Sequence, residues 1–119
     1  MTTASKSIFC ALVGIVIAAM AWLPAAGPAH AQNATVVTIT VKNHRFEPAE
    51  YQAPANRPIT LQIRNQDPTP MEFESVSLRV EKVIAGNGQG TINLRPLSPG
   101  RYNFFDDFNQ QAKGVLVVQ

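Results

Sequence analysis

The C-terminal end of the chain fixes its architecture and reads Gly100-Arg-Tyr-Asn-Phe-Phe-Asp-Asp-Phe-Asn-Gln-Gln-Ala-Lys-Gly-Val-Leu-Val-Val118. Tyr102 and Phe104 are two residues apart, a spacing that places both side chains on the same face of a strand. The more polar segment from Phe105 to Lys113 follows and predicts a loop of nine residues. Beyond Gly114, the apolar run predicts a final strand.

Short segments rich in β-branched or alternating residues make up the rest of residues 32–119. Val36–Val41 is β-branched throughout, and Ile59–Arg64 alternates so that its Ile and Leu side chains would be buried. Asn56, in a turn between two prolines, is expected to take a positive φ. Further strands are predicted at Glu50–Ala53, Met71–Glu74, Leu78–Ile84 and Thr91–Leu94. Because such short strands are not stable alone, we expect an all-β sandwich of seven to eight strands in two packed sheets.

The first 31 residues have the features of a secretory signal peptide. Lys6 precedes a continuous apolar run, Ile8–Leu23, and Ala29-His30-Ala31 matches an Ala-x-Ala cleavage site. We therefore expect residues 1–31 to be a signal peptide removed on export, and residues 32–119 to form one periplasmic domain. An uncleaved anchor is the alternative, although the apolar run is shorter than the roughly 20 residues of a membrane span.

Composition excludes several classes of function for residues 32–119. Cys10 is the only cysteine and lies in the predicted leader, so the domain has neither a disulfide nor a thiolate ligand. Of the ten Lys and Arg residues only Lys6 lies in the leader, and the remaining nine nearly balance eight Asp and Glu. Without a basic run, a nucleic-acid partner is not expected. No catalytic triad or phosphate-binding glycine loop indicates an enzyme or a small-molecule substrate, because Gly86-x-Gly88-x-Gly90 precedes no helix.

Three motifs in sequence order resemble those of the cupredoxins, the small copper-carrying β-sandwiches. The C-terminal pattern of that family is Tyr-x-Phe-x-Cys-x-x-His-x-x-Met-x-Gly-x-Leu-x-Val, and its Tyr, Phe, Gly, Leu and Val are all present here. The early motif Asn-x-x-Phe-x-Pro is matched by Asn43–Pro48, and the segment that supplies the first copper ligand is similar to Asn65–Met71. The resemblance implies a single cupredoxin-like Greek-key β-sandwich.

The same resemblance places a different residue at each copper-ligand position. Laid on the family pattern, the His, Cys, His and Met ligands are replaced by Met71, Asp106, Asn109 and Ala112. The thiolate and imidazoles of a blue-copper centre are therefore missing, and type 1 copper is not expected.

Among cupredoxin-like proteins, the EfeO and FtrB type of bacterial iron-uptake system is similar in a Glu-aromatic-Glu unit after the proline-rich loop, here Glu72-Phe73-Glu74. This resemblance implies a periplasmic metal-binding accessory protein in iron uptake. Such a protein would bind or deliver iron, or oxidise ferrous iron, beside a membrane iron permease and other periplasmic iron-uptake components.

The candidate metal ligands are mostly carboxylates at the end of the sandwich where the resembled fold brings two loops together. They are Glu72, Glu74, Asp106 and Asp107, with Met71 and His44 as outer candidates. Oxygen donors favour iron, manganese, calcium or magnesium, and a carboxylate–His mixture also accepts Cu(II). We therefore expect a metal ion, iron or copper.

Each candidate also has a structural interpretation. Asp106-Asp107 fits a solvated turn, and the two glutamates fit a polar strand face if Phe73 points into the core. Met71 fits the core, and His44 fits the surface. Two alternative functions stay open: a metal-free degenerate cupredoxin acting as an interaction module through exposed phenylalanines, and an oxidoreductase whose metal site a partner completes.

Overall fold

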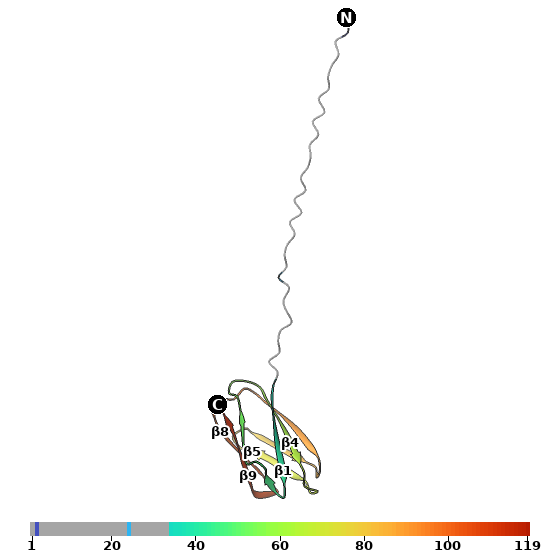
Figure 1. The fold of residues 1–119 in the computed structure, drawn as a ribbon, viewed down its shortest axis with the longest axis vertical. Helices are drawn as coiled ribbons and strands as arrows, with labels where there is room; N and C mark the ends of the chain where they lie inside the picture. The colour runs from blue at the N-terminus through green and yellow to red at the C-terminus, as the bar shows by residue number, and fades with distance from the viewer. Residues whose placement is uncertain (1, 3–23, 25–33) are drawn as a thin grey trace.

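The computed structural model describes residues 2, 24 and 34–119 (Figure 1). The predicted signal peptide, residues 1–31, lies outside this part of the chain except for residues 2 and 24. No helix long and apolar enough to cross a membrane occurs among the described residues.

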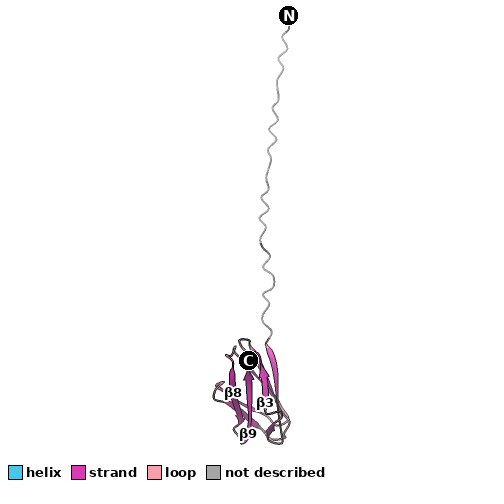
Figure 2. Ribbon diagram, turned by 60° about the vertical axis from the view of Figure 1, so that its left-hand side comes forward, coloured by secondary structure: helices cyan, strands magenta, loops and turns pink. Residues whose placement is uncertain are grey.

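The described residues form two sheets and contain no helix. One sheet has the order β2-β1-β4-β7 and the other the order β3-β9-β8-β5-β6. Both sheets are mixed, because β1 pairs parallel with β4 and β3 pairs parallel with β9, and Figure 2 shows β3, β9 and β8 running side by side. The strands are β1 (Thr35–Lys42), β2 (Arg45–Phe46), β3 (Glu50–Ala53), β4 (Ile59–Asn65), β5 (Met71–Ser75), β6 (Val80–Ile84), β7 (Gln89–Leu94), β8 (Gly100–Asp106) and β9 (Asn109–Val118).

The all-β sandwich predicted from the sequence is confirmed, with nine strands instead of seven to eight. The additional strand is β2, a two-residue segment that pairs with the end of β1. In β4 the predicted alternation is present, since Ile59, Leu61 and Ile63 are all buried. Asn56 has a φ of 60°, as predicted for the turn before β4.

Three phenylalanines join the two sheets in the core. Phe46 of β2 meets Phe104 of β8 edge to face, with ring centroids 4.8 Å apart, and Phe73 of β5 lies 5.0 Å from Phe104. All three side chains are buried. Aromatic pairs at this separation add stabilisation beyond the area that they bury. The first motif, the proline-rich segment and the C-terminal hairpin are thereby held at fixed positions relative to one another.

The predicted nine-residue loop from Phe105 to Lys113 is wrong. β8 and β9 continue as paired strands and leave only the two-residue turn Asp107-Phe108. Phe105 pairs with Lys113 but Asp106 pairs with Asn109, so three additional residues of β9 form a bulge between these pairs. The turn is tight because a carboxylate oxygen of Asp106 accepts a hydrogen bond from the Phe108 N–H at 3.0 Å.

Strand β6 begins at Val80, two residues later than predicted. The preceding residues form a turn in which the Ser75 hydroxyl oxygen accepts a hydrogen bond from the Leu78 N–H at 3.3 Å. Arg79 completes this turn with a φ of 56°, in the left-handed region, before the strand starts. The next strand, β7, begins at Gln89, two residues earlier than the predicted Thr91.

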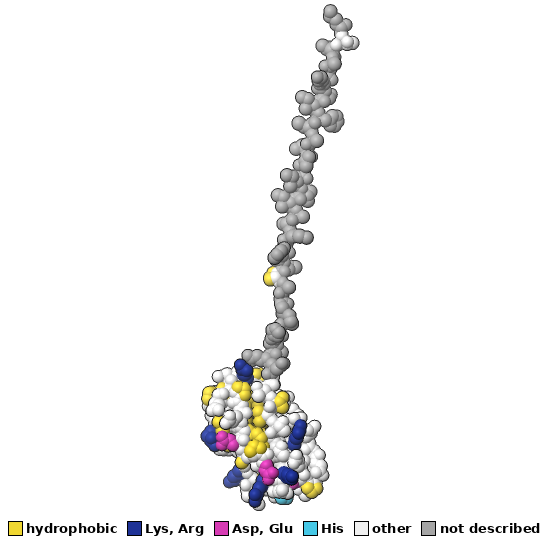
Figure 3. Space-filling model, in the orientation of Figure 1, with side chains coloured by type: hydrophobic (Ala, Val, Ile, Leu, Met, Phe, Trp, Pro, Cys, Tyr) yellow, Lys and Arg dark blue, Asp and Glu magenta, His cyan; other side chains and the backbone are white. Residues whose placement is uncertain are grey.

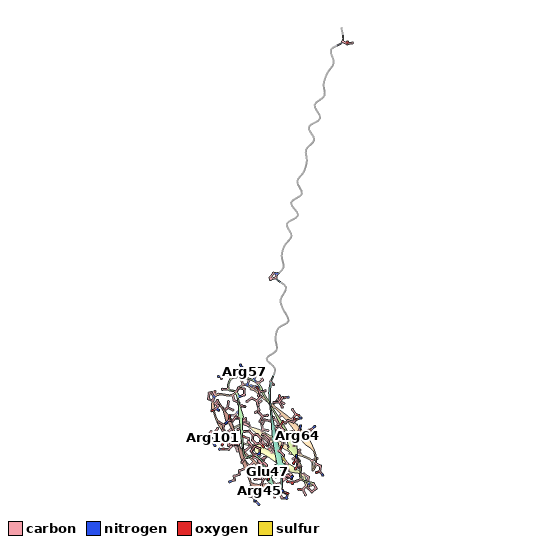
Figure 4. All side chains as sticks on the ribbon, viewed as in Figure 1. Arg45, Glu47, Arg57, Arg64 and Arg101 are labelled. Atoms are coloured by element: carbon pink, nitrogen blue, oxygen red, sulfur yellow. The ribbon has the colours of Figure 1, made fainter. Side chains whose placement is uncertain are left out.

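Acidic and basic side chains lie close together on one face of the domain. Figure 3 shows one face of the domain, on which Lys and Arg side chains lie near Asp and Glu side chains and a band of hydrophobic side chains runs between them. On the same view, Arg45 and Glu47 lie at one end of the domain and Arg57 at the opposite end, near the point where the chain enters β1 (Figure 4).

Candidate metal centre

The residue at the cysteine position of the cupredoxin pattern, Asp106, is part of the hydrogen-bond framework. Its side chain is 1% exposed. One carboxylate oxygen accepts hydrogen bonds from the N–H groups of Glu72 and Phe108, both at 3.0 Å, and the other lies 3.5 Å from the Asn109 amide nitrogen. Asp106 therefore links the start of β5 to the turn of the β8–β9 hairpin.

The other substituted ligand positions are equally unsuited to blue copper. Met71 and Ala112 are buried in the hydrophobic core, and Asn109, the first residue of β9, pairs with Asp106. The described part of the chain contains no cysteine, and one Asp106 carboxylate oxygen is already shared by two backbone donors. Since type 1 copper requires a cysteine thiolate, these residues do not fit that centre.

Three of the predicted acidic ligands meet elsewhere, on the outer face of the five-stranded sheet. Glu72, Glu74 and Asp107 each offer one carboxylate oxygen, and these oxygens lie within 4.8 Å of one another. We call this group the outer-face cluster. The alternation of β5 explains it, because Met71 and Phe73 point into the core and the two glutamates must point outward. Asp107 joins them because its N–H donates to the Glu72 carbonyl at 2.9 Å.

A fourth acid, Glu81, belongs to the same face. It lies directly opposite Glu74 across the β5–β6 pair. A hydrogen bond to the Glu81 side chain, together with burial and the negative charges of Glu81, Asp107 and Glu74, raises the pKa of Glu72 to about 7. Burial and repulsion from Asp107 and Glu81 also raise the pKa of Glu74. Neighbouring negative charges repel one another, and Glu72 is only 8% exposed, so the ionised form of these carboxyl groups is disfavoured.

Among residues 34–119, no ion pair includes Glu72, Glu74 or Asp107. In this part of the chain, Arg101 forms an ion pair with Glu50 at 3.8 Å, and His44 Nδ1 lies 3.8 Å from an Asp67 carboxylate oxygen, a contact that is an ion pair only when the imidazole is protonated. Neither pair includes a member of the cluster. The spacing of the three oxygens suits a shared cation, because oxygens bound to one ion at about 2.0–2.6 Å lie within about 5 Å of each other.

His44 does not join this group. It is exposed in the turn between β1 and β2, where Asn43 and His44 have φ values of 51° and 57°. The Asp67 carboxylate holds this turn by accepting the N–H groups of Asn43 at 2.7 Å and His44 at 2.9 Å. Asp67 is in turn positioned by Asn65, whose side-chain oxygen accepts the Asp67 N–H at 3.1 Å. The proline-rich segment and the first motif are thus joined through Asp67.

Two residues that matter for the site were not singled out from the sequence. Glu81 could have been found by assuming a β5–β6 hairpin, but the register that places it opposite Glu74 depends on where the intervening turn ends. Asp67 was recognised only as part of a motif. Its role depends on hydrogen bonds to Asn43 and His44, which lie 24 and 23 residues earlier in the chain, and no local pattern indicates such contacts.

The sequence and the fold of the chain relate it to known proteins. It belongs to the cupredoxin-like domain family, whose model matches residues 15–118. A curated relative, the uncharacterized protein RP394 of Rickettsia prowazekii (strain Madrid E), is 41% identical over 87 residues, which cover 72% of this chain and 70% of the relative.

Solved structures of other proteins share the fold of this chain. The metal-binding domain of the Cu(I)-exporting P-type ATPase CopA of Streptococcus pneumoniae D39, determined with Cu(I), has a TM-score of 0.64 and 19% identity, covering 71% of this chain and 84% of that one. Auracyanin B has a TM-score of 0.62 and 18% identity, covering 72% and 89%. At these identities the similarity shows the fold, and it supports the cupredoxin-like architecture predicted from the sequence.

Proposed function

We propose that this protein is a metal-binding cupredoxin-like domain that holds its ion at the outer-face cluster instead of at the blue-copper position. The convergence of three carboxylate oxygens within 4.8 Å, without a compensating ion pair among residues 34–119, carries the proposal. A bound cation would remove the repulsion that raises the pKa of Glu72.

The donor set determines which ions are tested. Glu72, Glu74 and Asp107 offer oxygen only, and oxygen ligands suit iron, manganese, calcium and magnesium better than Cu(I). Iron is our first candidate because of this chemistry and because of the Glu-aromatic-Glu resemblance. Copper is tested beside it, since the similar domain of CopA was determined with Cu(I) and another similar structure is that of a copper-binding protein.

The cellular setting belongs to the same proposal. An exported accessory protein that delivers iron, or assists its oxidation, next to a membrane iron permease would use a site with open coordination positions. Three carboxylates leave such positions for water or for a ligand from a partner. Intact mass of the protein recovered from periplasm tests the export step, and a chain beginning at Gln32 is the expected result.

The test is to titrate the metal-free protein with metal ions and to measure binding by calorimetry and by the change in thermal unfolding. Fe(II) under anaerobic conditions, Mn(II), Ca(II) and Cu(II) are added separately. Binding stabilises the folded state by about 2.7 kcal/mol when free metal reaches a hundredfold excess over the dissociation constant. We expect this gain to disappear in Glu72→Gln, Glu74→Gln and Asp107→Asn.

The matched control is Glu47→Gln, an exposed acid at the end of the domain next to Arg45 (Figure 4). It removes the same charge outside the cluster and should leave binding unchanged. If no ion raises the unfolding temperature, or if Glu47→Gln reduces binding as much as the cluster variants do, the proposal is wrong.

A second candidate function, a metal-free interaction module, is favoured by exposed apolar side chains around the cluster. Val83 lies opposite Glu72 and is 57% exposed, while Phe108 follows Asp107 and is 52% exposed. Val76, after β5, is 78% exposed and lines a small groove with Phe105. If metal binding fails, Phe108→Ser and Val83→Ser should weaken capture of a partner by this face.

A further inference from the structure

A cleft at the open edge of the sandwich is lined by none of the residues of the outer-face cluster. It has a volume of about 520 Å³ and is lined by the turn before β6, the end of β7 and the segment after β7. Small-molecule sites in proteins commonly have volumes of about 300–1,000 Å³. The cleft is therefore large enough for a small ligand.

The cleft forms because the two sheets separate along their edge strands. β6 ends the five-stranded sheet and β7 ends the four-stranded sheet. Near Gly90 the two strands are close, since a Cβ at Gly90 would lie 3.0 Å from Ile84 Cγ1. Further along, Lys82 Nζ donates to the Thr91 carbonyl at 2.9 Å and bridges the edge. Beyond this bridge, at Val80, the strands part and the cleft opens.

The floor of the cleft is apolar and continuous with the core. Leu94 is a buried core residue, and Leu78, Val80 and Leu97 are partly buried and pack against the core. These four side chains all line the cleft. An apolar group placed there would be removed from water at a favourable free energy proportional to its area.

Two arginines supply positive charge at the same cleft. Arg79 and Arg95 both line it and are exposed, and neither belongs to the ion pairs found among residues 34–119. No acidic residue lines the cleft. The Arg79 backbone has a φ of 56°, an uncommon conformation for a residue other than glycine, and its N–H donates to the Val76 carbonyl at 3.2 Å. The turn therefore holds Arg79 in a fixed backbone position.

We propose that this cleft binds a small anionic amphiphile, a carboxylate joined to a single alkyl chain. The chain lies on Leu78, Val80, Leu94 and Leu97, and the carboxylate accepts hydrogen bonds from Arg79 and Arg95. Guanidinium–carboxylate pairs are strong and directional, which explains two arginines at an apolar cleft. Residues 1–33 include an apolar run but no Asp or Glu, so this segment does not supply the anion.

The proposal is tested with dodecanoate, added to the full chain below the micelle concentration of the ligand. We expect saturable one-to-one binding by calorimetry and shifts of the methyl NMR signals of the four floor residues. The double variant Arg79→Gln/Arg95→Gln should weaken binding by about tenfold or more, because two charge-assisted hydrogen bonds are lost. Dodecyltrimethylammonium, with the same chain and the opposite charge, should not bind.

The matched control is Arg57→Gln/Arg64→Gln, which removes two exposed arginines elsewhere on the domain (Figure 4) and should leave the affinity unchanged. Glu72→Gln should also leave it unchanged, so this test is independent of the metal proposal. The proposal is overturned if dodecanoate shifts methyl signals elsewhere in the chain, or if the double variant binds as tightly as the unaltered protein. Binding to phosphatidylglycerol vesicles without binding to free dodecanoate would also overturn it, in favour of a lipid-surface contact.

Discussion

Replacing Asp106 and Asp107 one at a time distinguishes a structural carboxylate from a metal ligand. Loss of Asp106 is expected to reduce stability, and loss of Asp107 is expected to abolish metal binding. Asp106 is buried and accepts two backbone N–H groups through one oxygen. Asp107 belongs to the outer-face cluster. The sequence alone would assign the same role to both, since they are adjacent acids in one turn.

The loss of stability expected for Asp106→Ala follows from the two backbone N–H donors that would lose their acceptor. The Glu72 N–H is in a buried position, and leaving a buried donor unsatisfied costs about 1–3 kcal/mol. The Phe108 N–H lies at the turn and can reach water, so its loss adds only about 0.5–1.5 kcal/mol. We therefore expect the free energy of unfolding to fall by about 1.5–4.5 kcal/mol.

Asp106→Asn refines this expectation. The amide oxygen can accept the same two N–H groups, but these hydrogen bonds are no longer charge-assisted. The new NH₂ group replaces the carboxylate oxygen that lies 3.5 Å from the side-chain nitrogen of Asn109, so two donors face each other there. The loss should be about 1–2 kcal/mol, since hydrogen bonds to charged groups contribute more than neutral ones. Binding of metal at the outer-face cluster should persist in this variant.

The assay is urea unfolding of the metal-free variants followed by far-UV circular dichroism, with metal titrations in parallel. For a domain of this size, 1 kcal/mol corresponds to a change in melting temperature of about 4–8 °C. Asp107→Asn is the paired control and should lose metal binding without losing stability. If Asp106→Asn keeps full stability and abolishes metal binding, Asp106 is a ligand and the hydrogen-bond account is wrong.

Three other predictions follow from single contacts or charges. Gly114→Ala should destabilise the protein by about 1–3 kcal/mol, because the added Cβ would overlap the buried Phe104 ring; a chemical-denaturation curve matching the unaltered protein would contradict this. For Glu72, whose pKa is raised from 4.5 to about 7, the folded state retains the proton over this range and the unfolded state releases it, so metal-free stability should fall as pH rises from 4.5 to 7 and then level off. Thermal unfolding across this range should show a flatter profile in Glu72→Gln. Added Cu(II) should give no intense absorption near roughly 600 nm, the region of thiolate-to-copper charge transfer, and such a band would refute the account of the ligand positions.

Most of the fold could be predicted from local patterns. The alternation of β4, the β-branched β1 and the turn at Asn56 depend on residues within a few positions of one another, and each matches the structure. The final hairpin was predicted incorrectly between Phe105 and Lys113. The polar segment between the two apolar runs suggested a loop there, whereas the Asp106 carboxylate closes the turn and lets both strands continue.

The candidate site was harder to predict because its geometry depends on strand register. Period-two alternation was enough to place Glu72 and Glu74 on one face of β5, opposite to Phe73. It could not show that Asp106 points inward while Asp107 points outward, since that depends on the two-residue turn. Nor could it place Glu81 opposite Glu74, since a one-residue shift would turn Glu81 to the other face.

The position of Asp106 explains how the cupredoxin frame persists without its copper ligands. In the resembled pattern, one ligand comes from the start of β5 and three come from the C-terminal hairpin, so a bound ion would join these two segments. Here the Asp106 carboxylate joins the same segments by accepting the Glu72 N–H from β5 and the Phe108 N–H from the hairpin. The carboxylate thus provides a cross-link within the fold. Because this link keeps β5 and the hairpin turn adjacent, Glu72, Glu74 and Asp107 converge on the outer face of the same two segments. Asp106 therefore stands at the cysteine position of the copper pattern and, together with the Asp107 N–H bond to the Glu72 carbonyl, holds the two segments that carry the acidic cluster.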